Sequence, residues 1–274
     1  MRLAKQKNKL IAPMKSSNLR FGSRMLIVIL LLVASCEKSM AFSSHSTNIK
    51  TITAKRDRTA NDYDTSLHIV SGIDEWPVVA QASVFVATYA GLIGGTWVGS
   101  TLLDDLSKSN LEQWRNTFID KIIPLLLGTV YLTAGVGHFV AADAFRDIYP
   151  PPGTWGFWYL PGSAAFHVAW TGVVETAGGS GLLYAAINNN FSEDELEIPW
   201  ILIQPISALA LFLLTVVVTP ANIYMFTHGA IMGDMESLGW SFHVIRFFIQ
   251  VVLLSLLLAL TKDSFFFVWG DELD

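Results

Sequence analysis

The sequence predicts an all-α membrane protein with five transmembrane helices. Of its 274 residues, 52% are hydrophobic and only 15% are charged, and the mean hydropathy is +0.44, far above that of an ordinary soluble domain. Apolar stretches of about 20 residues recur along the chain, and a helix of that length crosses about 30 Å of hydrocarbon. Each stretch is expected to be helical because lipid does not tolerate unpaired backbone groups.

The charge balance and the cysteine content argue against several classes of protein. The net charge of −5 and the pI near 5.6 argue against a nucleic-acid partner, which requires a basic face. The single cysteine, Cys36, lies in the N-terminal segment, so that the processed protein has no thiol. This argues against a disulfide framework, a CxxC redox centre and cysteine-ligated zinc or iron–sulfur centres, and no metal site is predicted.

Residues 1–41 are typical of a signal peptide, because a basic stretch precedes the short apolar run Met25–Ala34. Residues 42–56 are rich in Ser and Thr and free of acidic residues, as in a transit peptide. This order, with Ala41–Phe42 at the junction, resembles the bipartite plastid presequence of diatoms and related algae. The resemblance implies a plastid membrane, envelope or thylakoid. Two alternatives remain open: a plain secretory signal, which implies a secretory-pathway membrane, and a bacterial lipobox at Val33–Cys36.

A polar linker at residues 57–76 precedes the first predicted helix of the mature protein, at 77–103. This segment is uncharged, and its glycines Gly91, Gly95 and Gly99 recur at every fourth position. Such spacing favours a face that another helix approaches closely. The alternative is the general abundance of glycine in membrane helices.

Four further apolar segments follow a charged loop at residues 104–121. They are Ile122–Ala142, Ala164–Ala186, Pro199–Phe226 and Phe242–Leu260, and an acidic tail at 262–274 ends the chain. Pro220 removes a backbone donor and frees a carbonyl one turn earlier, which a side chain of a neighbouring helix is expected to take up. Three prolines and several aromatic residues in 143–162 predict a rigid interfacial loop, which either covers a pocket or forms an aromatic belt.

One carboxylate, Glu175, lies near the middle of the third apolar segment. An ionised carboxylate in hydrocarbon costs several kcal/mol unless it is paired. Alternating helix directions bring the polar ends of the later segments to one membrane surface. Arg246 is the simplest partner there, because a guanidinium stays charged and matches a carboxylate, and Asn222 and Gln250 are expected to complete the shell.

These polar residues predict a ligand or proton-relay pocket within the membrane. Its members are His138, Glu175, Asn222, Arg246 and Gln250, with His167 and His243 as accessory candidates. Ionisable residues inside a membrane are functional hypotheses by default, and the alternative is that the cluster only fixes helix register. Two facing histidines would suit a b-type haem, although the spacing does not require one.

Four motifs, in order, resemble those of the DoxX-like integral membrane family. They are Gly135–Phe139 with Phe145 and Ile148–Pro151, Thr171–Glu175 with Gly178, Gly181 and Leu182–Leu183, Thr219–Met225, and Arg246–Gln250. The resemblance covers about residues 120–261 and implies a four-helix transmembrane bundle, to which the helix at 77–103 is an addition. Some members of this family are subunits of quinone-linked oxidoreductases or associate with redox enzymes, whereas most have no known activity.

Three functions are compatible with the sequence, and whether the protein is an enzyme stays open. The first is a redox-linked subunit that binds a quinone or another lipophilic molecule, in contact with a membrane or peripheral redox complex. The second is a non-catalytic assembly or scaffold protein of a plastid membrane complex, whose glycine face at 77–103 meets the partner. The third is a small transporter, which a single polar cluster and the lack of internal repeats support poorly.

Overall fold

The computed structural model describes residues 73, 75–108, 117–191, 202–233 and 239–269, all of which belong to one compact unit. The signal peptide predicted at 1–41, the transit-like segment at 42–56 and most of the linker at 57–76 lie outside the described residues.

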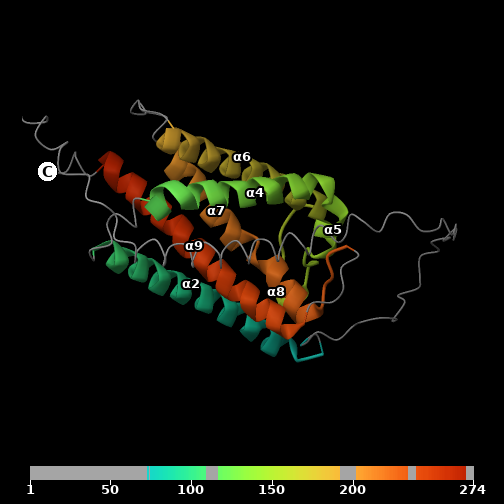
Figure 1. The fold of residues 1–274 in the computed structure, drawn as a ribbon. Helices are drawn as coiled ribbons and strands as arrows, with labels where there is room; N and C mark the ends of the chain where they lie inside the picture. The colour runs from blue at the N-terminus through green and yellow to red at the C-terminus, as the bar shows by residue number, and fades with distance from the viewer. Residues whose placement is uncertain (1–72, 74, 109–116, 192–201, 234–238, 270–274) are drawn as a thin grey trace, which may run out of the picture. The chain divides into compact units, whose positions relative to one another are not determined.

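Every regular element in the described ranges is a helix (Figure 1). The elements are α2 (Val78–Lys108), the π-helical turn η4 (Phe118–Ile122), α4 (Ile123–Val140), α5 (Ala142–Asp147), the 3₁₀ turn η5 (Thr154–Gly156), α6 (Ala164–Phe191), α7 (Ile203–Val217), α8 (Thr219–His228) and α9 (Trp240–Trp269). The last helix therefore continues into the tail predicted from residue 262 onward.

Four of the described helical segments are long and apolar enough to cross a membrane: Val78–Leu106, Ile123–Val140, Ile203–His228 and Trp240–Lys262. The sequence predicted a fifth span at Ala164–Ala186. The helix α6 forms there and has 28 residues, but it is less apolar than the other four, since it carries Glu175, His167 and several glycines. In its described ranges the protein is thus an all-helical membrane protein with four segments that can span a bilayer, and α6 packs against two of them, α4 and α7.

Consecutive long helices alternate in direction, and they pack side by side in the order α4, α6, α7, α9 and α2 (Figure 1). The C-terminal end of α4, the start of α6, the end of α8 and the start of α9 therefore lie at the same end as α5 and η5. This confirms the expectation that alternating helices gather these polar ends on one side.

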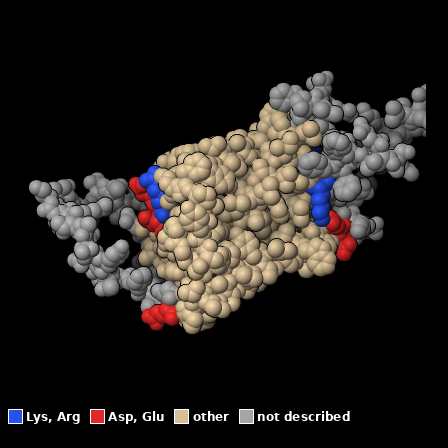
Figure 2. Space-filling view, turned by 180° about the vertical axis from the view of Figure 1, so that it is seen from behind, with Lys and Arg blue, Asp and Glu red and all other residues tan. Residues whose placement is uncertain are grey.

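Apart from the buried Glu175 and the half-buried Arg246, charged side chains in the described ranges lie towards the two ends of the helices. On the face shown in Figure 2, a wide band of uncharged residues separates the two charged regions. Lys262 of α9 pairs with Asp104 of α2 at 3.7 Å at one end, and Arg146 of α5 pairs with Asp143 at 2.6 Å at the other. An uncharged band between two charged rims is what a bilayer requires.

Glycines bring the backbones of α4 and α6 into contact. A methyl group added at Gly179 would lie 2.9 Å from the Gly128 carbonyl oxygen, and one added at Gly135 would lie 2.9 Å from the Gly172 carbonyl oxygen. The glycines of each helix are seven residues apart, which places them two turns apart on one face. We call this contact between α4 and α6, formed by Gly128, Gly135, Gly172 and Gly179, the seam. A methyl group added at Gly172 would lie 2.7 Å from the His138 Cβ, so that His138 also packs against the seam.

The glycine face of α2 packs against α9 in the same chain. Methyl groups added at Gly91 and Gly95 would each lie 2.9 Å from a side chain of α9, Phe247 and Val251 respectively. Gly99 faces the Ser255 hydroxyl more closely still. The predicted packing face therefore exists, but its partner is α9. The expectation that this face meets another protein was wrong, because its close-packing surface is already used.

A loop between α5 and α6 is anchored by one buried tryptophan. Trp155 is 2% exposed, and its indole N–H donates to the Thr227 hydroxyl of α8 at 3.0 Å. The centroid of its ring lies 4.8 Å from the ring centroid of Phe85 in α2. Trp155 also has a φ of 55°, a left-handed conformation that costs about 1 kcal/mol or more outside glycine. Packing against α2 and α8 holds the loop in this conformation.

Candidate functional site

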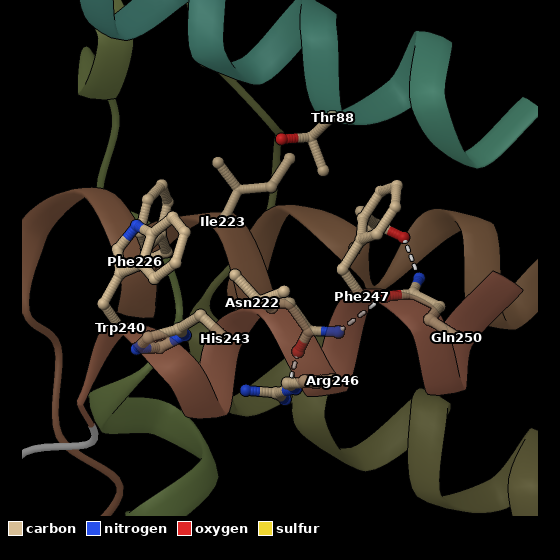
Figure 3. A pocket seen from close by; sticks show the side chains of 11 residues that line it. Thr88, Asn222, Ile223, Phe226, Trp240, His243, Arg246, Phe247 and Gln250 are labelled. Atoms are coloured by element: carbon tan, nitrogen blue, oxygen red, sulfur yellow. Dashed lines mark hydrogen bonds between the residues drawn. The ribbon is translucent and has the colours of Figure 1, made fainter. Parts of the chain in front are cut away.

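A pocket of about 200 Å³ lies between α2, α8 and α9 (Figure 3). Its lining comprises Thr88 of α2, Thr219, Asn222, Ile223 and Phe226 of α8, and Trp240, His243, Val244, Arg246, Phe247 and Gln250 of α9. The volume is smaller than that of pockets that enclose a whole drug-sized ligand. It suits a headgroup or a single ring, with the rest of such a molecule outside the pocket.

One wall of the pocket is a directed chain of hydrogen bonds (Figure 3). Arg246 donates to the Asn222 side-chain oxygen, and the Asn222 amide nitrogen donates to the Gln250 side-chain oxygen at 3.2 Å. The Gln250 amide nitrogen then donates to the Thr219 hydroxyl at 2.6 Å. These bonds join α8 to α9 on the inner side of the pocket.

The remaining lining is largely aromatic and aliphatic. Phe226, Trp240 and Phe247 contribute rings, and Ile223 and Val244 contribute branched side chains. Trp240 is 67% exposed at the start of α9, whereas Gln250 is buried nearly three turns further along the same helix. The pocket thus combines a polar inner wall with an exposed aromatic residue towards the helix end.

The break between α7 and α8 positions Asn222 and Thr219. Pro220 has no N–H to donate to the Val216 carbonyl one turn earlier. The Tyr89 hydroxyl of α2 donates to that carbonyl instead, at 3.0 Å. Gln250 of α9 donates to the neighbouring Thr215 carbonyl at 3.3 Å. The expectation that neighbouring helices take up a carbonyl freed by Pro220 is confirmed.

Glu175 does not pair with Arg246, so that prediction was wrong. Glu175 lies against His138, with its Oε2 2.9 Å from the histidine Nδ1. Both residues are 8% exposed. The reason is helix order: α6 packs between α4 and α7, and α9 lies beyond α7. The Glu175 and Arg246 side chains therefore belong to helices that are not neighbours.

The His138 ring is fixed by several contacts. Its Nδ1 lies 3.0 Å from the Ala134 carbonyl as well as 2.9 Å from Glu175, and both of these groups are acceptors. The Nδ1 atom must therefore carry a hydrogen. The ring stacks on Phe145 at a centroid distance of 3.8 Å. Glu175 Oε2 accepts no bond of regular hydrogen-bond geometry within the described part of the chain, although it is buried.

The predicted single cluster is divided between two places. Asn222, Arg246, Gln250 and the accessory candidate His243 line the pocket, whereas His138 and Glu175 lie in the seam between α4 and α6. A hydrogen bond that was not predicted from the sequence links these two places. Tyr131 lies seven residues before His138 on α4, and its hydroxyl contacts the Thr215 hydroxyl at 2.6 Å. Thr215 is the residue whose carbonyl Gln250 contacts.

His167 is held by structural contacts. Its Nε2 lies 2.9 Å from the Pro161 carbonyl, and its Nδ1 accepts a bond from the Trp170 indole at 3.0 Å. The Tyr149 ring stacks on it at 5.3 Å, and burial raises the pKa of the Tyr149 hydroxyl. Both imidazole nitrogens are thus engaged: Nε2 holds the loop against α6, and Nδ1 bonds within α6. The facing histidine pair that a b-type haem needs is not formed by His138 and His167.

Comparisons with known proteins identify no relative: no family model, curated protein or solved structure matches the chain. The chemistry must therefore be taken from the residues themselves. In the described ranges no three histidine, cysteine or acidic residues are grouped to hold a metal ion. The pocket offers amide and guanidinium groups beside aromatic rings, an arrangement suited to binding and orienting a molecule with one polar end.

Proposed function

We propose that this membrane protein binds a quinone or another lipophilic molecule in the pocket between α2, α8 and α9. We further propose that it is a subunit of a redox complex in a plastid membrane. The observation that carries the proposal is the pairing of a polar wall, Asn222–Arg246–Gln250, with an aromatic wall in one pocket. A polar ring or head would meet the amides and the guanidinium. Its apolar part would meet Phe226 and Phe247.

The plastid location and the DoxX-like family remain parts of this proposal. Their support is the presequence pattern and the four ordered motifs described above. Two of those motifs, Thr219–Met225 and Arg246–Gln250, supply the polar wall of the pocket. The other two supply Gly135 and Gly172 of the contact between α4 and α6, and the pair of His138 with Glu175.

The proposed roles of the polar residues differ. Asn222, Arg246 and Gln250 contact the bound molecule or orient a group that does. His138 and Glu175 hold α4 against α6 at a distance from the pocket lining. Electrons would come from a bound cofactor or a partner complex, and the proposal assigns no redox step to the side chains themselves.

A second candidate is a non-catalytic assembly protein. The observation in its favour is that most polar groups of the wall already bond to one another, as they would if they only fixed the helices. In that case the lipid-facing side of α2, which exposes Val86, Ile93 and Trp97, is the surface left for a partner.

Extraction of bound lipophilic molecules separates the two candidates. The full chain is purified in mild detergent, and small molecules released by organic solvent are identified by mass spectrometry. The same is done for Arg246→Met, which alters the pocket, and for Glu175→Gln, which lies outside it. Circular dichroism checks the fold of each variant.

A bound redox lipid that is retained by Glu175→Gln and lost by folded Arg246→Met supports the pocket. A folded wild type that releases only bulk membrane lipid contradicts the proposal. Equal loss from both folded variants also contradicts it, since the site would then not be the pocket described.

A further inference from the structure

The orientation of the Asn222 side chain is dictated by Arg246. A guanidinium has donors only, so that Asn222 must turn its oxygen towards Arg246. The amide nitrogen of Asn222 then faces the Gln250 oxygen at 3.2 Å. The opposite orientation would set donors against donors at both contacts.

The side-chain amide hydrogens of Gln250 and Asn222 differ in whether they have acceptors. Gln250 donates one to the Thr219 hydroxyl and one to the Thr215 carbonyl. Asn222 donates one to Gln250, and no acceptor for the other lies among the residues that the structure describes. Asn222 also lines the pocket. A donor without a partner is more costly than an unused second lone pair on a carbonyl oxygen.

We infer that Asn222 determines the specificity of the pocket for a molecule whose polar end carries a hydrogen-bond-accepting oxygen. The inference rests on the proposed function, because it requires that the pocket bind a lipophilic molecule. The second amide hydrogen of Asn222 donates to a carbonyl or carboxylate oxygen of that molecule. Arg246 acts as a positioning residue that holds the amide in this orientation, and its positive charge disfavours an ammonium head.

Photoreactive probes with one alkyl chain and three different heads test this inference. The heads are a methyl ketone, a carboxylate and a primary ammonium, and each chain carries a diazirine. The full chain is reconstituted in phosphatidylcholine vesicles and labelled, and the labelled peptides of α8 and α9 are quantified by mass spectrometry. Each probe is compared between wild type and Asn222→Asp, so that differences in membrane partitioning cancel. Asn188→Asp makes the same chemical change in α6 and serves as the control.

Asn222→Asp is expected to lower pocket labelling by the ketone and carboxylate probes roughly three- to tenfold, the loss of one hydrogen bond, and to raise labelling by the ammonium probe. Asn188→Asp should leave all three unchanged. A fall for the uncharged ketone probe supports the inference, because the new carboxylate repels the carboxylate probe and attracts the ammonium probe through charge alone. Pocket labelling that is independent of the head in folded Asn222→Asp overturns it and leaves the proposed function standing. Absence of wild-type pocket labelling by every probe overturns the proposed function itself.

Competition on the wild-type protein provides a measurement that needs no variant. Unlabelled ketone and carboxylate of equal chain length should displace the ketone probe at lower membrane concentrations than the corresponding amine. Displacement by the amine at an equal or lower concentration overturns the inference.

Discussion

The Tyr89 hydroxyl of α2 donates a hydrogen bond to the Val216 carbonyl of α7 at 3.0 Å. That carbonyl lies four residues before Pro220, which has no N–H with which to satisfy it. The helix that precedes the predicted four-helix bundle therefore completes the bend that forms one side of the pocket. Since Thr88 of the same helix lines the pocket, α2 belongs to the site as much as α8 and α9 do.

Tyr89→Phe should destabilise the protein by about 1 kcal/mol, because it removes the hydroxyl that donates to the Val216 carbonyl in an apolar setting. The measurement is the free energy of unfolding in mixed micelles titrated with a denaturing detergent. Pro220→Ala restores a backbone N–H to the bend, so that Tyr89→Phe should be less harmful in that background. Equal effects of Tyr89→Phe in both backgrounds would show that this hydrogen bond does not compensate for the proline.

The sequence was a good guide to the helices and to their order in space. Runs of about 20 apolar residues predict membrane helices reliably because each backbone must be satisfied within its own segment. The fifth predicted span, α6, was less apolar than this rule requires, because its glycines serve packing against α4 and α7. The sequence does contain a pattern that indicates this packing. Gly128 and Gly135 are seven residues apart, as are Gly172 and Gly179, which places each pair on one helix face.

The candidate site could be predicted only in part, for a physical reason. A sequence shows which residues share a helix face, and Arg246 and Gln250 do share one. It does not show which helices are neighbours, and that decides whether Glu175 meets His138 or Arg246. The long helices α4 and α6 follow one another along the chain, separated only by the short elements α5 and η5 and their loops, and elements close in sequence are usually neighbours in space. Their contact forms the pair of His138 with Glu175.

Gly179→Ala should destabilise the protein by about 1–3 kcal/mol, because the added methyl would lie 2.5 Å from the Leu132 backbone nitrogen and neither backbone can yield cheaply. Gly94→Ala is the matched control. It makes the same change on an exposed part of α2 where nothing lies within 4 Å of the added methyl. This control should be neutral or slightly stabilising, since alanine favours a helix over glycine. Equal unfolding free energies for the two variants would argue against a close seam between α4 and α6.

Trp155→Ala should destabilise the protein by about 3 kcal/mol, because it removes a fully buried indole and its bond to Thr227. Tyr159→Ala in the same loop removes a side chain that is 74% exposed and should have little effect. Thermal unfolding followed by circular dichroism at 222 nm avoids the loss of the tryptophan signal. If the loop merely rests on the membrane surface and does not anchor α8, the two variants will unfold at similar temperatures.

His138→Leu should destabilise the protein more than Glu175→Gln does, because the two changes leave different groups behind. The first leaves a buried carboxylate without its partner, and breaking a buried pair in this way costs on the order of 3 kcal/mol. The second replaces the carboxylate by a neutral amide of the same shape, which can still accept a hydrogen bond from the histidine Nδ1. Its cost should be about 1 kcal/mol or less.

The double variant His138→Leu with Glu175→Gln provides the decisive comparison. It removes the buried charge that His138→Leu leaves without a partner, and it should therefore be more stable than His138→Leu alone, as measured by unfolding free energies in mixed micelles. The carboxylate would be responsible for the loss of stability in that case. If instead the two effects simply add, the histidine stabilises the seam through its stacking on Phe145 and its contact with Ala134, and the charge of Glu175 plays no part in holding α4 against α6.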